Sequence, residues 1–192
     1  MKKENIIKDT LILFLITVVL VLILSITKVV TQSKIDSTNY ANKIKAFNEV
    51  CPGYVSSENI EEEVVGASAG YNATLYGEES ILRCKNEANE IIGYIVQTTS
   101  KGYGGPLNII VGFDKKGNIA GVRFATIPEE TPGLGMKATQ NKFLDSWLDH
   151  NNDNIDDVDS ISGATLTSNA FREAMKLACM FANRAVTLDG GI

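Results

Sequence analysis

The sequence has few of the side chains that hold metal ions or iron–sulfur clusters. Its 192 residues include three cysteines, Cys51, Cys84 and Cys179, and one histidine, His150. The cysteines lie far apart and form no CxxC pair, so the ligand sets of zinc and iron–sulfur sites are missing and no metal is expected. Any redox chemistry of this chain therefore depends on a cofactor that it binds.

An excess of basic residues is also missing. Lys and Arg total 18 against 23 Asp and Glu, which gives a formal net charge of -5, and no basic stripe is present. Nucleic-acid binding is disfavoured, because affinity for a phosphate backbone depends on clustered Lys and Arg. The 4 prolines, 16 glycines and 44% apolar residues are ordinary for a folded chain. The length fits one domain with an appendage.

Charge is absent from one long stretch near the N-terminus. Residues 10–27 read TLILFLITVVLVLILSIT, eighteen residues without a charged side chain. As a helix this run is ~27 Å long, close to the ~30 Å of a hydrocarbon core, so a single transmembrane helix is predicted. The alternative is a cleaved signal peptide, but its apolar region is typically ~7–15 residues long and ends in a small-residue cleavage site. Residues 25–30 offer no good site.

Lysines on both sides of this run predict its orientation. Three of them precede it and two follow it: Lys2, Lys3 and Lys8, then Lys28 and Lys34. Because Lys and Arg concentrate on the cytoplasmic side, we expect the N-terminus inside and the main domain outside the cytoplasm. The chain accordingly divides into a membrane anchor, residues 1–35, and an extracytoplasmic domain, residues 36–192. This domain has 13 basic and 21 acidic residues, which disfavours binding to anionic lipid.

The first part of the domain reads as a helix followed by loops. Residues 36–50 carry Tyr40, Ile44 and Phe47 at helical spacing, which predicts an amphipathic helix. The sequence Cys-Pro-Gly at 51–53 ends it. Two acidic or glycine-rich stretches follow and are expected to be loop or weak helix, at 58–63 and 66–77.

The rest of the domain reads as strands and then helices. Runs rich in β-branched residues predict two hairpins, with strands over 80–85, 91–99, 108–113 and 118–127. Apolar faces predict helices over 142–150 and 168–186. Because the strands precede the helices without βαβ alternation, the sequence predicts an α+β fold in which helices flank an antiparallel sheet.

The segment leading into the last helix is the most informative about chemistry. Residues 159–168 read DSISGATLTS. Small side chains, hydroxyls and free N–H groups at a helix start can bind an anion such as phosphate. The same composition also fits simple helix capping by Thr167 or Ser168. Both interpretations are open on the residues alone.

Two glycine-rich segments flank the second hairpin. They read YGGPL at residues 103–107 and EETPGLG at residues 129–135. Glycine lets a backbone approach a flat ligand closely, and Pro-Gly fixes a turn. Their position around one hairpin suggests that they lie near one another. The alternative is that both are only connections.

The three motifs together resemble a known family. DSISGAT (residues 159–165) is similar to the D-x-x-(S/T)-G-A-T sequence at which flavin transferases attach FMN to threonine through a phosphoester bond. YGGP and ETPGLG resemble the FMN-binding domain shared by the G subunit of the Rnf electron-transport complex and the C subunit of the sodium-pumping NADH:quinone oxidoreductase. The motifs occur in the family's order, over residues 36–186. The short chain resembles the Rnf G subunit more than the longer C subunit.

The resemblance implies a role for each motif residue. Thr165, the last residue of the DSISGAT match, would be esterified to the FMN phosphate. The other FMN-binding residues that it implies are Ser162, Gly163 and Ala164 in the tight approach, Leu166 and Thr167 at the helix start, and Glu130, Thr131, Gly133, Leu134 and Gly135 around the isoalloxazine. No side chain is expected to act as a catalytic acid or base, because the flavin supplies the redox chemistry.

The function implied by the resemblance is electron transfer. The chain would be a subunit of a membrane-bound ion-translocating ferredoxin:NAD oxidoreductase, the Rnf complex, with covalent FMN. Its partners would be the other membrane subunits and, during maturation, a flavin transferase. Three alternatives are the C-type subunit of the quinone-linked complex, a module that binds FMN noncovalently, and a structural anchor without flavin.

Several other residues have simpler expected roles. The three cysteines are expected to be buried, and Trp147 to belong to the core because of its helical spacing with Phe143. His150 is expected at an exposed helix end. Residues 151–157 (NNDNIDD) lack the EF-hand pattern, so a solvated acidic loop is favoured over a calcium site.

Overall fold

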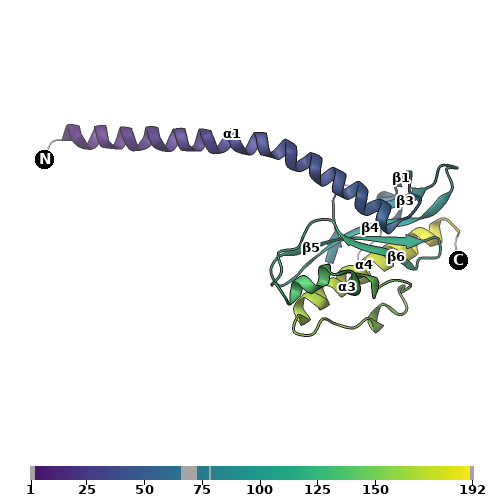
Figure 1. Cartoon of the computed structure of the whole chain (residues 1–192). Helices are drawn as coiled ribbons and strands as arrows, with labels where there is room; N and C mark the ends of the chain where they lie inside the picture. Colours follow the sequence, from purple (N-terminus) through teal and green to yellow (C-terminus); the bar gives the residue numbers. More distant parts are fainter. Residues whose placement is uncertain (1–2, 66–72, 78, 191–192) are drawn as a thin grey trace. The chain divides into compact units, whose positions relative to one another are not determined.

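The computed structural model describes residues 3–65, 73–77 and 79–190 (Figure 1). Two compact units are present, residues 1–41 and residues 42–192. The long helix α1 (Lys3–Val50) begins in the first unit and ends in the second. Its side chains are described for residues 10–26, for Lys28 and from Lys43 onward.

The described part of the first unit is helical and belongs to α1. Between residues 11 and 26 its large apolar side chains are all exposed, from 40% for Val18 to 70% for Leu13. Over the described residues, no helix combines the length and the apolar character that a membrane crossing requires.

A six-stranded antiparallel sheet forms the centre of the second unit. Its order is β1-β3-β4-β5-β6, and β2 pairs with β4. The strands are β1 (Ser56–Asn59), β2 (Ala73–Leu75), β3 (Ile81–Lys85), β4 (Ile91–Lys101), β5 (Pro106–Asp114) and β6 (Ile119–Phe124). Both predicted hairpins, β3–β4 and β5–β6, are confirmed, and so are the α+β class and the antiparallel sheet with flanking helices.

Two short strands were not predicted. Strand β1 and the short helix α2 (Glu61–Val64) occupy the acidic stretch expected to be loop or weak helix. All four residues of β1 are exposed, so its sequence shows no apolar alternation. Strand β2 lies in the second expected loop, of which residues 66–72 lie outside the described part of the chain. Strand β1 forms by backbone pairing with β3, and strand β2 by backbone pairing with β4.

The C-terminal helices differ from their predicted bounds. Helix α3 spans only Asn141–Asp145, and α4 spans Thr165–Leu188, beginning three residues before its predicted start. After α3 the chain turns through Asp149, whose φ is +62°. The Ile119 N–H donates to the His150 carbonyl at 2.8 Å, and the Asp149 N–H donates to the Ile119 carbonyl at 2.9 Å. The prediction for His150 was therefore wrong, because this residue is half-buried against β6 and ends no helix.

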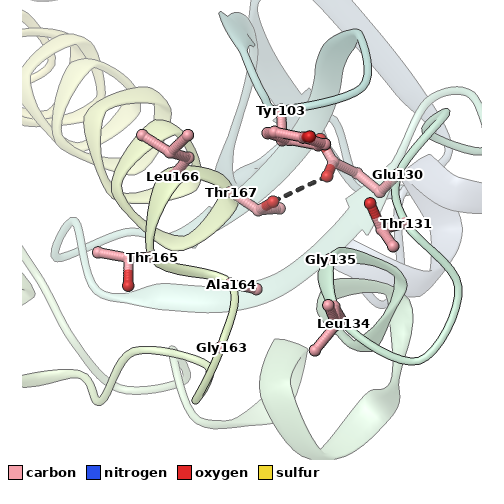
Figure 2. Close-up of a pocket in the computed structure, with 10 residues that line it drawn as sticks. All are labelled: Tyr103, Glu130, Thr131, Leu134, Gly135, Gly163, Ala164, Thr165, Leu166 and Thr167. Carbon is pink, nitrogen blue, oxygen red and sulfur yellow. Dashed lines mark hydrogen bonds between the residues drawn. The ribbon is translucent and has the colours of Figure 1, made fainter.

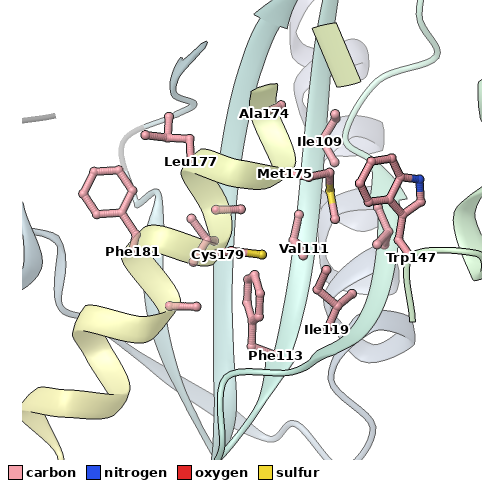
Figure 3. Packing of buried hydrophobic residues seen from close by; sticks show 14 of the residues in the cluster. Ile109, Val111, Phe113, Ile119, Trp147, Ala174, Met175, Leu177, Cys179 and Phe181 are labelled. Atoms are coloured by element: carbon pink, nitrogen blue, oxygen red, sulfur yellow. The ribbon is translucent and has the colours of Figure 1, made fainter. Parts of the chain in front are cut away.

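The main core lies between α4 and one face of the sheet (Figure 3). Trp147 packs here with its ring centroid 5.9 Å from that of Phe143 and 5.3 Å from that of Phe171. Its predicted place in the core is confirmed, and Cys179 is buried in the same cluster. The acidic loop also contacts this layer, because the Asp156 carboxylate pairs with Lys176 on α4 at 2.7 Å. That carboxylate is therefore held against the helix.

The opposite face of the sheet receives the end of α1. Phe47 and Val50 are buried in a second, smaller cluster with residues of β3, β4 and β5. The predicted amphipathic end of this helix is confirmed there; the side chain of Tyr40 lies outside the described part. Gly112 and Gly121 face each other across β5 and β6. A Cβ at either one would overlap the Val50 main chain, so these glycines let the helix lie directly on the sheet.

Candidate functional site

A cavity of about 420 Å³ lies at the N-terminus of α4 (Figure 2). Three segments that are separate in the sequence meet there, namely the loop before β5, the loop after β6 and the start of α4. The lining residues are Tyr103, Glu130, Thr131, Leu134, Gly135, Gly163, Ala164, Thr165, Leu166 and Thr167. The volume falls within the ~300–1,000 Å³ range of small-molecule sites.

The first turn of α4 has unsatisfied N–H groups. Gly163, with φ of +80°, turns the chain into the helix, and Ala164 is the N-cap residue. Among the described residues no side chain caps the helix, and its first internal bond runs from the Ser168 N–H to the Ala164 carbonyl at 2.9 Å. The N–H groups of residues 165–167 therefore point out of the helix start, where the helix dipole favours an anion.

The capping interpretation of this segment was wrong. Thr167 and Ser168 lie inside the first turn and are each only 2% exposed. The Ser168 hydroxyl donates to the Ala164 carbonyl at 3.0 Å and accepts the Ile161 N–H at 2.9 Å. Ser168 thus fixes the chain that enters the helix and leaves the helix N–H groups free.

Two threonines of the same turn have opposite environments. The Thr167 hydroxyl donates to Glu130 Oε2 at 2.8 Å (Figure 2). Thr165 is exposed, and within the described part of the chain no hydrogen bond engages its hydroxyl. Thr165 therefore has the hydroxyl that an incoming group can reach, whereas Thr167 holds two segments together.

Glu130 is the central polar residue of the cavity. Its side chain is largely buried, with the residue 7% exposed, and its Oε1 accepts the Gly104 N–H at 3.2 Å. This bond and the one from Thr167 join all three segments, so the two glycine-rich segments do lie near one another, as expected.

Glycines make room for this carboxylate. A Cβ on Gly102 would overlap Glu130 Oε1, and a Cβ on Gly135 would overlap Oε2 and lie 2.9 Å from the Thr167 hydroxyl. A Cβ on Gly104 would overlap the main chain of Glu129. These glycines therefore let the chain pack closely against Glu129 and Glu130.

The rim of the cavity is apolar and exposed. Tyr103 is 69% exposed, Leu166 65% and Leu134 43%. Figure 2 shows these three side chains on different sides of the opening. An apolar rim beside free helix N–H groups suits a ligand that carries an anionic group next to a flat apolar one.

Most residues singled out from the sequence meet at this cavity. Nine of them line it, whereas Gly133 and Ser162 do not. Gly133 has φ of +77° and forms the turn that brings Leu134 and Gly135 to the cavity. Tyr103 lines the cavity but was absent from the expected set. The signal for it was present, since it opens the YGGP motif.

Two family models match the chain. One is described as an FMN-binding domain and matches residues 102–179. The other is described as the RnfG N-terminal region and matches residues 1–50. All ten cavity residues lie within the first match.

Curated relatives are G subunits of ion-translocating complexes. The G subunit of the ion-translocating oxidoreductase complex of Haemophilus influenzae (strain PittEE) is 30% identical over 73% of this chain and 72% of that protein. The G subunit of the Na⁺-translocating ferredoxin:NAD⁺ oxidoreductase complex of Acetobacterium woodii is 27% identical over 87% and 86%. The G subunit of the proton-translocating ferredoxin:NAD⁺ oxidoreductase complex of Clostridium ljungdahlii is 30% identical over 55% and 60%.

Proposed function

Because the chain belongs to the family of G subunits of ion-translocating oxidoreductase complexes, we propose that it transfers electrons through FMN within such a complex. The relatives named above include G subunits of ferredoxin:NAD⁺ oxidoreductases, which favours the ferredoxin-linked complex over the quinone-linked one. One observation carries the proposal. The cavity lies at the N-terminus of α4, where the N–H groups of the first turn point outward. All its lining residues belong to the FMN-binding domain, and it suits an anionic, flat ligand.

The FMN phosphate is attached to Thr165 in this proposal. Three features of the chain support that position: Thr165 is exposed, its hydroxyl is free in the described part, and the N–H groups of the first helical turn lie beside it. The helix start stabilises the phosphate charge. Thr167 is a poor alternative, because its hydroxyl is buried and bound to Glu130. A flavin transferase would form the phosphoester bond.

The other cavity residues position the ring. Tyr103, Leu134 and Leu166 offer apolar contact to the isoalloxazine at the rim, and Thr131 and Gly135 lie on the loop that faces it. Bound FMN supplies the redox chemistry, and the chain supplies position, exclusion of water and electrostatics. The phosphoester bond would keep the cofactor on a protein whose site opens outside the cytoplasm.

The N-terminal helix anchors the domain to the membrane in this proposal. Its support is the uncharged run of residues 10–27 in the sequence and the exposure of the large apolar side chains within it. No helix of the described residues meets the requirement for a membrane crossing, so the sequence of residues 10–27 carries this part of the proposal. The lysine distribution favours an N-terminus in the cytoplasm and an FMN-binding domain outside it. The other membrane subunits of the complex are then its partners.

The intact mass of the denatured full-length chain tests the attachment. The chain is co-expressed with a flavin transferase, and wild type should gain the mass of one FMN less one water, located by peptide mapping on the Thr165 peptide. Thr165→Ala should remain unmodified. Ser160→Ala is the matched control, because it removes an exposed hydroxyl at a variable position of the same motif and should keep the flavin.

Three outcomes would overturn all or part of the proposal. Flavin that leaves on denaturation would replace the phosphoester by noncovalent binding. Covalent flavin retained by Thr165→Ala would move the attachment to another residue. A chain that takes up no flavin at all, covalent or free, would refute the electron-transfer function.

A further inference from the structure

Two of the three cysteines lie together beneath the end of α1. Cys51 follows the last residue of that helix, and Cys84 lies on β3. Both belong to the smaller buried cluster on the face of the sheet that α1 covers, and they are 4% and 0% exposed. Cys179 lies in the main core on the opposite face. The chain therefore has one cysteine pair and one separate cysteine.

The backbone around Cys51 explains the pairing. The Cys51 N–H donates to the Phe47 carbonyl at 2.9 Å, which continues the last turn of α1. The Tyr54 N–H returns to the Cys51 carbonyl at 3.1 Å, and the Val55 N–H then donates to the Lys85 carbonyl at 3.0 Å. This tight turn holds Cys51 close to the end of β3.

The orientation of Cys84 completes the pair. Side chains alternate along a strand, and Leu82 and Cys84 both point to the α1 face while Ile81 points to the main core. Strand β1 pairs Ser57 with Cys84, so the segment that follows Cys51 runs alongside β3. Cys84 thus lies on the same side of the sheet as Cys51.

The two thiols share one buried cluster, and each perturbs the other. The neighbouring Cys84 thiol lowers the pKa of Cys51, against the effect of burial. The neighbouring Cys51 thiol and burial both raise the pKa of Cys84. By contrast, burial alone raises the pKa of Cys179, to about 12. Cys51 is also the more accessible thiol of the pair, at 4% exposed against 0% for Cys84, so it is the one that meets an oxidant first.

We propose that Cys51 and Cys84 are a redox couple that closes to a disulfide by exchange with a small disulfide such as oxidised glutathione. The Cys51 thiolate attacks the oxidant, which releases one glutathione thiol and leaves a mixed disulfide. The Cys84 thiolate then attacks the Cys51 sulfur and releases the second glutathione thiol. The protein loses two electrons and two protons, and both appear in the two glutathione thiols.

The disulfide would join the end of α1 to the sheet. It closes a loop from residue 51 to residue 84 and so links the end of α1 covalently to β3, the strand next to the edge strand β1. The ion pair of Arg123 with Glu49, at 2.7 Å, holds the same helix end noncovalently. The inference does not depend on FMN, because neither cysteine lines the cavity.

Thiol counting on the full-length chain tests the proposal. The detergent-solubilised protein is equilibrated without oxygen at a series of reduced-to-oxidised glutathione ratios, quenched in acid, denatured and alkylated with N-ethylmaleimide. Intact mass should show three alkyl groups under reducing conditions and one under oxidising conditions, with a linked Cys51–Cys84 peptide. Cys179→Ala is the matched control and should lose only the remaining alkyl group.

The variants and a second measurement make the outcome decisive. Cys51→Ala should keep two alkylated thiols at every ratio. Cys84→Ala should carry one glutathione on Cys51 and one alkyl group under oxidising conditions, because the thiol that would release the glutathione is missing. The oxidised wild type should also unfold at a temperature higher than the reduced protein by on the order of 10 °C. That shift should persist in Cys179→Ala and vanish in Cys51→Ala. Three alkyl groups in wild type at every ratio, or a linkage that includes Cys179, would overturn the proposal.

Discussion

The hydrogen bond between Glu130 and Thr167 should be one of the largest single polar contributions to the stability of the site. Thr167 is 2% exposed and Glu130 7%, and the carboxylate also accepts the Gly104 N–H. Glu130→Ala leaves both donors without their acceptor. A buried group left unsatisfied costs ~1–3 kcal/mol, so the variant should lose about 2–4 kcal/mol of unfolding free energy. Thr167→Val removes one hydrogen bond to a charged group and should lose about 1.5–3 kcal/mol.

A double-mutant cycle measures this interaction. Unfolding of the full-length chain is followed in one detergent for wild type, both single variants and the double variant. The double variant should lose less than the sum of the single losses, by about 1–3 kcal/mol, because the two residues interact directly. Glu129→Ala is the matched control; this neighbouring carboxylate is exposed and its loss should cost under about 0.5 kcal/mol. Additive losses, or a Glu130→Ala variant as stable as Glu129→Ala, would refute the reasoning.

Three further predictions concern glycines and pH. Gly135→Ala should destabilise the wild-type chain by about 1–3 kcal/mol but cost clearly less in a Glu130→Ala background, since its Cβ would overlap that carboxylate; thermal unfolding of the four chains checks this. Gly112→Ala should lower the unfolding temperature by pushing Val50 off the sheet, and an unchanged value would contradict the close packing of α1. The hydrogen bond from Arg83 holds the pKa of Asp189 below its usual range, so its stabilisation is present above the unfolded pKa of ~3.9 and is lost as the pH falls through the folded value. The unfolding temperature of Asp189→Asn should therefore lie well below that of wild type at neutral pH, and the difference should shrink as the pH falls below ~3.9.

Periodic patterns predicted the long elements of the fold. Runs rich in β-branched residues indicated the hairpins of β3–β4 and β5–β6, and helix α4 shows one apolar face. Strand β1 is exposed throughout and β2 has only three residues, so neither shows such a pattern. Both form by backbone pairing with longer strands. Helix α3 is shorter than its apolar spacing predicts, since Trp147 and Leu148 remain packed after the helix has ended.

The sequence by itself determined the cofactor family, because the motifs DSISGAT, YGGP and ETPGLG are local strings whose chemistry can be recognised without coordinates. It also determined the uncharged N-terminal run and the α+β class. Only the tertiary structure decided that Glu130 binds both Gly104 and Thr167, which are 26 and 37 residues away. It likewise decided that Thr165 is exposed while Thr167 is buried, and that Cys51 and Cys84 share one buried cluster. Such contacts depend on how distant segments pack, which local residue spacing does not encode.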